Sequence, residues 1–257
     1  MKDLPNFTFE KKFWKKGYYV MGVDEVGRGA LAGPLYVGAV CFPGIFSDSV
    51  KSFPPASARL AANIARSVRY RETLPALPPE KIQNLGINDS KKLSPAKREK
   101  LARIIKNTCF AYATAFVSNK VVDKVGITKA TQIAMRKAIK SLIDNCYLLN
   151  RKKIFISIDA YYVKYLRGIP LKSQKAIIHG DEKSISIAAA SIIAKVERDQ
   201  NMIKLDHKYP IFRKYRWEKN KGYGTKKHIE AIKKFGKSKF HRGLFLRKIF
   251  NKFHLTS

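Results

Sequence analysis

Four carboxylates in this 257-residue sequence stand apart from its other acids. Asp24 and Glu25 follow a short apolar run, Asp159 ends the β-branched run at 154–158, and Asp181 follows a second brief apolar run. Most of the remaining acids lie among Lys and Arg in helical stretches, where solvated ion pairs suffice. Buried carboxylates are unfavourable unless they are paired or bound to a cation. These four acids are therefore the candidates for chemistry.

Acids at the ends of separate strands can meet at one edge of an α/β sheet, where ligands commonly bind. Such a cluster repels itself unless cations neutralise it. No His or Cys stands at ligand spacing beside these acids, and oxygen ligands alone suit hard cations such as Mg²⁺ or Mn²⁺. Each acid alone is more simply a cap or a surface residue. Together, Asp24, Glu25, Asp159 and Asp181 predict a metal centre.

The first two acids open a glycine-rich turn, Gly27-Arg28-Gly29, that ends at Gly33-Pro34. Neighbouring side chains on a regular strand face opposite sides, so Asp24 and Glu25 share one site only if the strand distorts. The glycines could allow that distortion, and they also let the backbone approach a ligand closely. The alternative is a hairpin with solvated acids at its tip.

The charge of the chain predicts a polyanionic partner. It has 52 Lys and Arg against 19 Asp and Glu, a formal net charge of +33, which exceeds what solubility requires. No apolar run reaches the length of a membrane span and no leader resembles a signal peptide, which favours nucleic acid over a membrane. Clustered carboxylates in a nucleic-acid-binding protein suggest phosphoryl transfer assisted by two metal ions.

Three cysteines, Cys41, Cys109 and Cys146, lie far apart in apolar segments. They lack metal-ligand spacing, and we interpret them as reduced core residues of a cytoplasmic protein. No exposed apolar stripe stands out, so a monomer is expected.

Periodicity predicts a mixed α/β fold: a five-stranded sheet flanked by helices, with a small C-terminal helical extension. The expected helices include a capped one from Pro95 to about residue 106 and a buried, small-residue one at 184–206. The other expected elements are strands at 18–26, 35–42, 109–117, 154–158 and 176–179 and helices at 128–149 and 225–235.

These elements divide the chain into three parts. Residues 1–17 are expected to form a basic N-terminal arm on the surface. Residues 18–206 are expected to form the catalytic domain, with a proline-rich insertion at about 43–86. Residues 207–257 are expected to form a helical substrate-binding region.

Several motifs, in fixed order, resemble the ribonuclease HII family, the type 2 ribonucleases H. The first is Asp24-Glu25-Val26-Gly27-Arg28-Gly29, followed by Gly33-Pro34-Leu35. The later motifs are Asn88-Asp89-Ser90-Lys91-Lys92-Leu93-Ser94, Ile158-Asp159, Gly180-Asp181, the helix at 186–199, and Asn220-Lys221-Gly222-Tyr223-Gly224-Thr225 with His228. The resemblance extends over about residues 18–245.

The resemblance implies a ribonuclease H-like fold and an endonuclease that cleaves RNA in RNA–DNA hybrids and single ribonucleotides embedded in duplex DNA. Two-metal-ion hydrolysis would leave 5′-phosphate and 3′-hydroxyl ends. The four acids match the family's metal-binding catalytic residues, and Gly27, Arg28 and Gly29 match its sensor of the 2′-hydroxyl. Tyr223 matches a tyrosine that stacks on the neighbouring sugar. Ser90, Lys91 and Lys92 would bind backbone phosphates.

Two alternatives remain: the related ribonuclease HIII, with the same chemistry, and a non-catalytic nucleic-acid-binding protein. The first usually carries an extra N-terminal domain and lacks the Gly-Arg-Gly turn, and the second needs no cluster of acids. Two segments depart from the family pattern. The insertion at 43–86 is long, and residues 161–173 are unusually rich in Tyr, Lys and Arg.

Overall fold

A six-stranded mixed sheet forms the centre of the computed structural model, which describes residues 4–42, 44, 68–70, 78–144, 146, 149 and 153–254. The strand order is β3-β4-β2-β1-β5-β6. β2 pairs antiparallel with β1 and β4, while β5 runs parallel to both β1 and β6. The strands are β1 (Tyr19–Val26), β2 (Leu35–Cys41), β3 (Val68–Tyr70), β4 (Ala111–Val117), β5 (Ile154–Asp159) and β6 (Gln174–Ile177).

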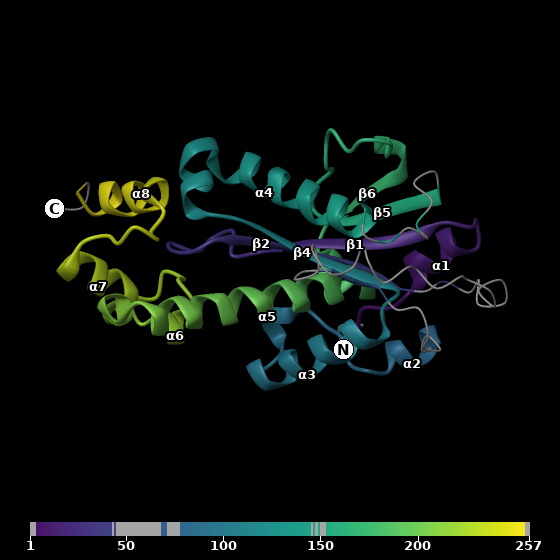
Figure 1. The fold of residues 1–257 in the computed structure, drawn as a ribbon, viewed down its shortest axis with the longest axis horizontal. Coiled ribbons are helices and arrows are strands. Elements are labelled where there is room, and N and C mark those ends of the chain that lie inside the picture. Colours follow the sequence, from purple (N-terminus) through teal and green to yellow (C-terminus); the bar gives the residue numbers. More distant parts are fainter. Residues whose placement is uncertain are drawn as a thin grey trace, which may run out of the picture.

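Helices cover both faces of this sheet. α4 packs on one face, and α5 packs on the other together with α3 and α1 (Figure 1). The last three helices gather at one end of the sheet, beside the turn after β1 (Figure 1). The helices are α1 (Thr8–Trp14), α2 (Pro79–Gln83), α3 (Pro95–Thr108), α4 (Asn119–Asp144, broken at Gly126), α5 (Ile185–Lys208), α6 (Trp217–Asn220), α7 (Lys226–Phe235) and α8 (Gly243–His254).

α5 lies unusually close to the two central strands because two strand residues are glycines. A Cβ on Gly22 would lie 2.1 Å from the carbonyl carbon of Ser186, and one on Gly38 would lie 2.2 Å from the Ala190 carbonyl oxygen. The first half of α5 is buried on every side, as its small-residue sequence predicts. The helix backbone therefore rests directly on the sheet.

The α/β class and the five expected strands are confirmed. A sixth strand, the three-residue β3, pairs with β4 at one edge. It belongs to the expected insertion at 43–86, of which residues 43, 45–67 and 71–77 lie outside the described residues. The three cysteines are buried, and none of the described helices combines the length and apolar character needed to span a membrane.

The expectation of a surface arm at residues 1–17 is wrong for the part that the structure describes. Residues 8–14 form α1, and both Phe7 and Trp14 are buried in the core beside α5. Glu10 is buried as well, and its Oε1 accepts hydrogen bonds from the Ser184 hydroxyl at 2.6 Å and the Ser186 N–H at 3.1 Å. The Phe- and Lys-rich sequence of residues 8–14 therefore forms a helix, one face of which is buried against the start of α5.

The close approach of α5 gives a test of stability. We expect Gly38→Ala to lower the free energy of unfolding by about 3 kcal/mol, because the Ala190 backbone cannot move aside. Gly29→Ala serves as the matched control, since a Cβ there meets no atom within 4 Å, and should change the stability by less than about 1 kcal/mol. Denaturant unfolding measures both, and equal stability of the two variants would contradict the packing described.

Candidate active site

Two of the predicted acids end neighbouring parallel strands. β1 and β5 pair in a register that aligns Val23 with Ile158, so Asp24 and Asp159 come next to each other at the same edge of the sheet. Asp181 follows β6 in a short 3₁₀ turn, Gly180–Glu182. The Gly180 N–H donates to Asp159 Oδ1 at 2.7 Å and ties this turn to the end of β5.

Asp24 and Glu25 lie on opposite faces of β1. The strand stays regular through Val26, with Asp24 opposite Gly38 and Glu25 opposite Val37. Asp24 shares the face that packs on α5, and Glu25 shares the face of Met21 and Val23, which packs on α4. The distortion that the glycines could have allowed does not occur. Asp24 Oδ1 instead accepts a hydrogen bond from the Glu25 backbone N–H at 2.7 Å.

Burial and mutual repulsion raise the pKa values of three of these acids. Asp24 is 5% exposed, and burial, followed by the charges of Glu25 and Asp159, raises its pKa well above the ordinary value. Burial also raises the pKa of Glu25, although the Arg28 guanidinium opposes it. The pKa of Asp181 is raised by burial, and Lys91 offsets only part of the shift. The acids therefore interact as one electrostatic cluster.

Two cations partly neutralise the cluster. Lys91 Nζ lies 3.6 Å from Asp181 Oδ2, and Arg28 Nη1 lies 3.5 Å from Glu25 Oε1. Burial lowers the pKa of Lys91, but the charges of Asp181 and Asp89 outweigh that effect and raise it. Asp181 and Glu25 thus each have a cation beside them, and the Lys91 side chain is 80% exposed.

The donor set fits a hard divalent cation. Its four side chains offer only carboxylate oxygens, as Mg²⁺ or Mn²⁺ prefers. Glu25 Oε2 is buried and has no hydrogen-bond partner in the structure, an unmet requirement that a cation would satisfy. Within the described residues, no three His, Cys, Asp or Glu side chains are arranged as a ready metal site.

Two buried arginines hold the glycine turn beside the acids. Arg242 donates from Nη1 to the carbonyl oxygens of Gly27 at 2.8 Å and Arg28 at 3.0 Å, and its Nε and Nη2 both reach the Gly33 carbonyl. Arg198, on α5, donates to the carbonyls of Pro34 and Ala32. Burial, together with the charge of Arg198, lowers the pKa of Arg242 to about 9.

Gly27 must remain a glycine for two reasons. Its φ of +88° is unfavourable for other residues, and a Cβ there would lie 2.1 Å from Arg198 Nε. Gly29, in contrast, has open space beside its Cα. The turn therefore has a fixed backbone and an open side, which suits recognition of a small group by backbone atoms.

The loop that carries Tyr223 docks on the same turn. The Gly222 carbonyl accepts hydrogen bonds from the N–H groups of Leu31 at 2.8 Å and Ala32 at 3.1 Å. The ring of Tyr223 lies beside the side chains of Lys195 and Arg198, with cation-to-centroid distances of 5.0 and 4.9 Å. Tyr223 and the Gly27–Gly29 turn are thus parts of one surface.

A pair of buried histidines supports this loop from behind. His228 Nδ1 donates to the Tyr223 carbonyl at 2.8 Å, because that oxygen can only accept. His228 Nε2 then accepts from Trp217 Nε1 at 3.2 Å and from His241 Nε2 at 3.1 Å. Burial is the main effect that lowers both histidine pKa values, that of His241 to about 3. Both rings stay neutral at physiological pH.

The three predicted phosphate-binding residues do not all face the solvent. Ser90 is 2% exposed, and its hydroxyl lies 3.0 Å from that of Ser191 on α5. The structure therefore favours a positioning role for Ser90 over the phosphate contact that the sequence predicts. Lys91 and Lys92 are exposed, and Lys92 pairs with Glu182 at 2.5 Å.

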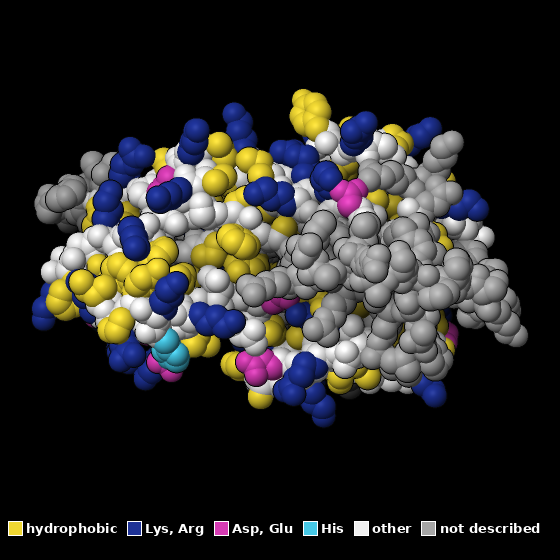
Figure 2. Space-filling model, viewed as in Figure 1, with side chains coloured by type: hydrophobic (Ala, Val, Ile, Leu, Met, Phe, Trp, Pro, Cys, Tyr) yellow, Lys and Arg dark blue, Asp and Glu magenta, His cyan; other side chains and the backbone are white. Residues whose placement is uncertain are grey.

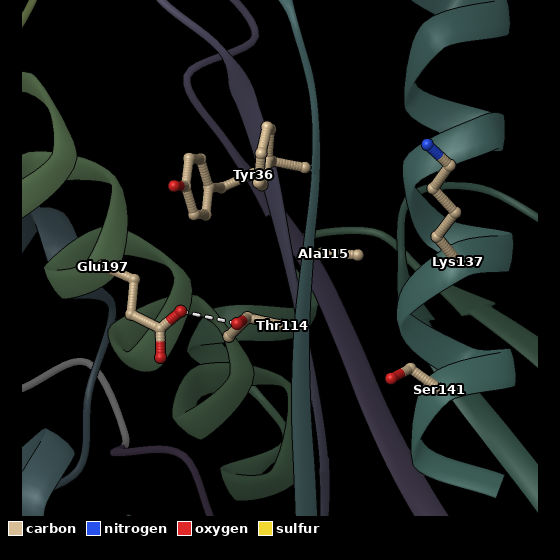
Figure 3. A pocket seen from close by; sticks show the side chains of 7 residues that line it. Tyr36, Thr114, Ala115, Lys137, Ser141 and Glu197 are labelled. Carbon is tan, nitrogen blue, oxygen red and sulfur yellow. Dashed lines mark hydrogen bonds between the residues drawn. The ribbon is translucent and has the colours of Figure 1, made fainter. Parts of the chain in front are cut away.

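A cavity of about 360 Å³ opens at a different place, between β4, α4 and α5 (Figure 3). Its one acid, Glu197, already accepts hydrogen bonds from Thr114 at 2.5 Å and from Lys106 at 2.7 Å. This cavity offers no second carboxylate, so it is not the acid site. Its lining residues are Tyr36, Thr114, Ala115, Phe116, Lys137, Ser141 and Glu197.

One face of the molecule is strongly basic. Lys and Arg side chains are spread across the face in Figure 2, while Asp and Glu appear only as small isolated spots. This agrees with the net charge of +33. A polyanion can therefore approach from many directions, and the few acids that are clustered stand out against this background.

Sequence reasoning missed four supporting residues: Arg198 and Arg242, which hold the glycine turn, and His228 and His241, which support the Tyr223 loop. Arg198 and His228 stand inside motifs that the sequence singles out, while His241 and Arg242 stand outside them. A weak signal existed, because Arg198 lies on the helix predicted to be central and buried, and a buried charge needs partners.

Comparison with known proteins agrees with the sequence motifs. The family model for ribonuclease HII matches residues 75–250. Ribonuclease HII of Caldicellulosiruptor bescii is 38% identical over 249 residues, which cover 96% of this chain and 97% of the relative. The crystal structure of ribonuclease H2 from Pyrococcus horikoshii OT3 is 25% identical, with a TM-score of 0.60 over 91% of this chain and 98% of that one. Bst-RNase HIII in complex with Mn²⁺ is 21% identical, with a TM-score of 0.57 over 85% and 63%, a likeness of fold.

The raised pKa of Asp24 predicts a gain of stability when its charge is removed. Between the ordinary pKa near 3.8 and the raised value, the folded state binds more protons than the unfolded state, so stability falls as pH rises. In metal-free buffer at pH 7, Asp24→Asn should therefore raise the free energy of unfolding by about 1–2 kcal/mol.

The gain should shrink as the pH approaches 4, and denaturant unfolding across pH measures it. Glu80→Gln, at an exposed position, is the control and should show no such trend. A less stable Asp24→Asn protein at pH 7 would mean that Asp24 has a structural role.

Proposed function

Because this chain belongs to the ribonuclease HII family and is a ribonuclease H endonuclease, we propose that it cleaves the RNA strand of RNA–DNA hybrids and single ribonucleotides embedded in duplex DNA. The products would carry 5′-phosphate and 3′-hydroxyl ends. The observation that carries the proposal is the electrostatic cluster of Asp24, Glu25, Asp159 and Asp181 at one sheet edge, beside a glycine turn with a fixed backbone. The matching family model describes ribonuclease HII, and the relative from Caldicellulosiruptor bescii is a ribonuclease HII. Both matches favour this family over ribonuclease HIII.

The four acids would hold Mg²⁺ or Mn²⁺, two ions in the catalytic state. Bound divalent ions supply an activated water and stabilise the charge on the leaving oxygen at phosphorus. The acids are suited to hold such ions because their chemistry is all oxygen and Glu25 Oε2 lacks a partner. Lys91 and Arg28 would keep the cluster folded between turnovers by neutralising Asp181 and Glu25.

Recognition of the ribonucleotide would fall to the Gly27–Gly29 turn. The 2′-hydroxyl distinguishes RNA from DNA and can both donate and accept a hydrogen bond. Backbone groups of Gly27, Arg28 and Gly29 could reach it because the turn has no side chain on its open side at Gly29. Arg242, which donates to the Gly27 and Arg28 carbonyls, would keep these backbone groups in place, and Arg198 would fix the end of the turn at Ala32 and Pro34. A sugar without the hydroxyl would then leave a backbone polar group of the turn without a partner.

The rest of the substrate would lie along the basic surface. Tyr223 would stack on the sugar next to the ribonucleotide, while Lys91 and Lys92 would contact phosphates. The C-terminal helices would flank the duplex, since the Tyr223 loop belongs to that region and docks on the turn. The proposed enzyme acts as a monomer.

A cleavage assay tests the proposal. Purified protein should cut duplex DNA with one embedded ribonucleotide in Mg²⁺ and leave all-DNA duplex intact. Asp24→Asn should abolish cleavage and leave binding of the duplex largely unchanged, because one charge is lost from a chain of +33. Tight binding without cleavage by the unaltered protein in either Mg²⁺ or Mn²⁺ would overturn the proposed activity.

Substitution of Tyr223 separates ring stacking from hydroxyl chemistry. Tyr223→Ala should lower kcat/KM on the embedded ribonucleotide roughly 10- to 100-fold, since loss of one stacking ring costs about 1–3 kcal/mol. Tyr223→Phe keeps the ring and should retain most of the activity. Steady-state kinetics on both variants measures this, and equal losses would assign the effect to the hydroxyl.

A further inference from the structure

The segment between the third and fourth acids forms a surface that the proposed active site does not use. Residues 160–173 make a loop that joins β5 to β6 and projects at the edge of the molecule (Figure 1). Tyr161, Tyr162 and Tyr165 are 38%, 46% and 90% exposed. We call these three rings, with the exposed side chains of Lys164, Lys172 and Lys175, the tyrosine ledge.

The backbone beneath the ledge is firmly anchored. The buried Gln174 side chain accepts from the Val163 N–H at 2.9 Å and donates to the Val163 carbonyl at 3.0 Å. Gln132, on α4, donates to the Tyr162 carbonyl at 2.9 Å and accepts from the Lys164 N–H at 3.3 Å. Val163 itself is fully buried in the core. The tyrosines are thus displayed from a fixed base and not from a loose loop.

Tyr165 carries a cost that the fold does not explain. Its φ of +61° lies in the left-handed region, which is unfavourable for a bulky residue. Its ring is 90% exposed, so this conformation brings no burial in return. Strained residues of this kind are typical of binding surfaces.

The ledge is continuous with the acid site. The guanidinium of Arg28 lies over the ring of Tyr161, 4.8 Å from its centroid, and the same side chain pairs with Glu25. Between Asp159 and Asp181 the sequence contains no acid but four cations, at 164, 167, 172 and 175. The ledge therefore begins at the acids and leads away from them as a positive, aromatic strip.

We propose that the tyrosine ledge binds an unpaired, single-stranded nucleic-acid tail that continues from the duplex held at the acid site. Exposed aromatic rings among cations are the chemistry of single-strand binding, because rings stack on bases and cations contact phosphates. A duplex buries the faces of its bases, so free rings match unpaired bases better. The inference rests on the proposed function, which places the duplex.

Binding to tailed hybrids tests the ledge. The measurements are made with Asp24→Asn, which prevents cleavage. Fluorescence anisotropy compares binding of a blunt RNA–DNA hybrid with binding of hybrids that carry one single-stranded tail of about eight nucleotides. The tail is placed at the 5′ or the 3′ end of either strand, one position per hybrid. One tail polarity should tighten binding at least about tenfold. The double variant Tyr162→Ala/Tyr165→Ala should lose most of that gain. The gain is measured for each protein as its affinity for the tailed hybrid relative to its affinity for the blunt hybrid.

Two further variants assign the effect to the rings. Tyr165→Phe keeps the ring and should keep the gain. Phe116→Ala removes another exposed aromatic, on β4 toward the other edge of the sheet, and should keep it as well. The proposal is overturned if no tail improves binding, or if the double variant retains the full gain. Failure of the unaltered protein to cleave the blunt hybrid would instead count against the proposed function.

Discussion

The site depends on how closely α5 lies against β1. One face of the helix, at four-residue spacing, follows the strand from its middle to the turn: Ser186 meets Gly22, Ala194 packs against Val26, and Arg198 meets Gly27. A side chain at Gly22 or Gly38 would push the helix outward. Arg198 would then lose the carbonyls of Pro34 and Ala32, and Ser191 would move away from Asp24. The geometry of the glycine turn is therefore set by packing several residues away from it.

Electrostatics opposes the stability of this arrangement. Three acids with raised pKa values lie at one sheet edge, and two arginines are buried beside a turn that offers them only carbonyl oxygens. Each charge has a cost that the fold tolerates because Lys91 and Arg28 offset the acids and because Arg242 binds three carbonyls at once. Ligands of opposite charge would stabilise such a site: cations would neutralise the acids, and phosphates would neutralise the Lys and Arg side chains.

Most of the fold could be predicted from the sequence, and so could the placing of Asp24, Asp159 and Asp181 at one edge of the sheet. The opposite faces that Asp24 and Glu25 take on a regular strand could not. Alternating and buried apolar runs define β1, β2, β4 and β5, and the small-residue sequence of α5 reveals its central place. β3 is only three residues long and depends on pairing with β4. The sequence of α1 is typical of a basic arm, and only the burial of Phe7 and Trp14 in the structure shows that it packs in the core. The roles of Arg242 and Ser90 depend on contacts between distant segments, which no local pattern records.

The most direct measurement is a crystal structure of the unaltered protein with Mn²⁺ and an RNA–DNA hybrid whose scissile phosphate resists cleavage. Anomalous scattering would locate the manganese ions. The account predicts manganese peaks bounded by Asp24, Glu25, Asp159 and Asp181, with the ribose 2′-hydroxyl against the backbone of Gly27–Gly29. Manganese bound away from these four acids, or a ribose held away from the turn, would contradict it.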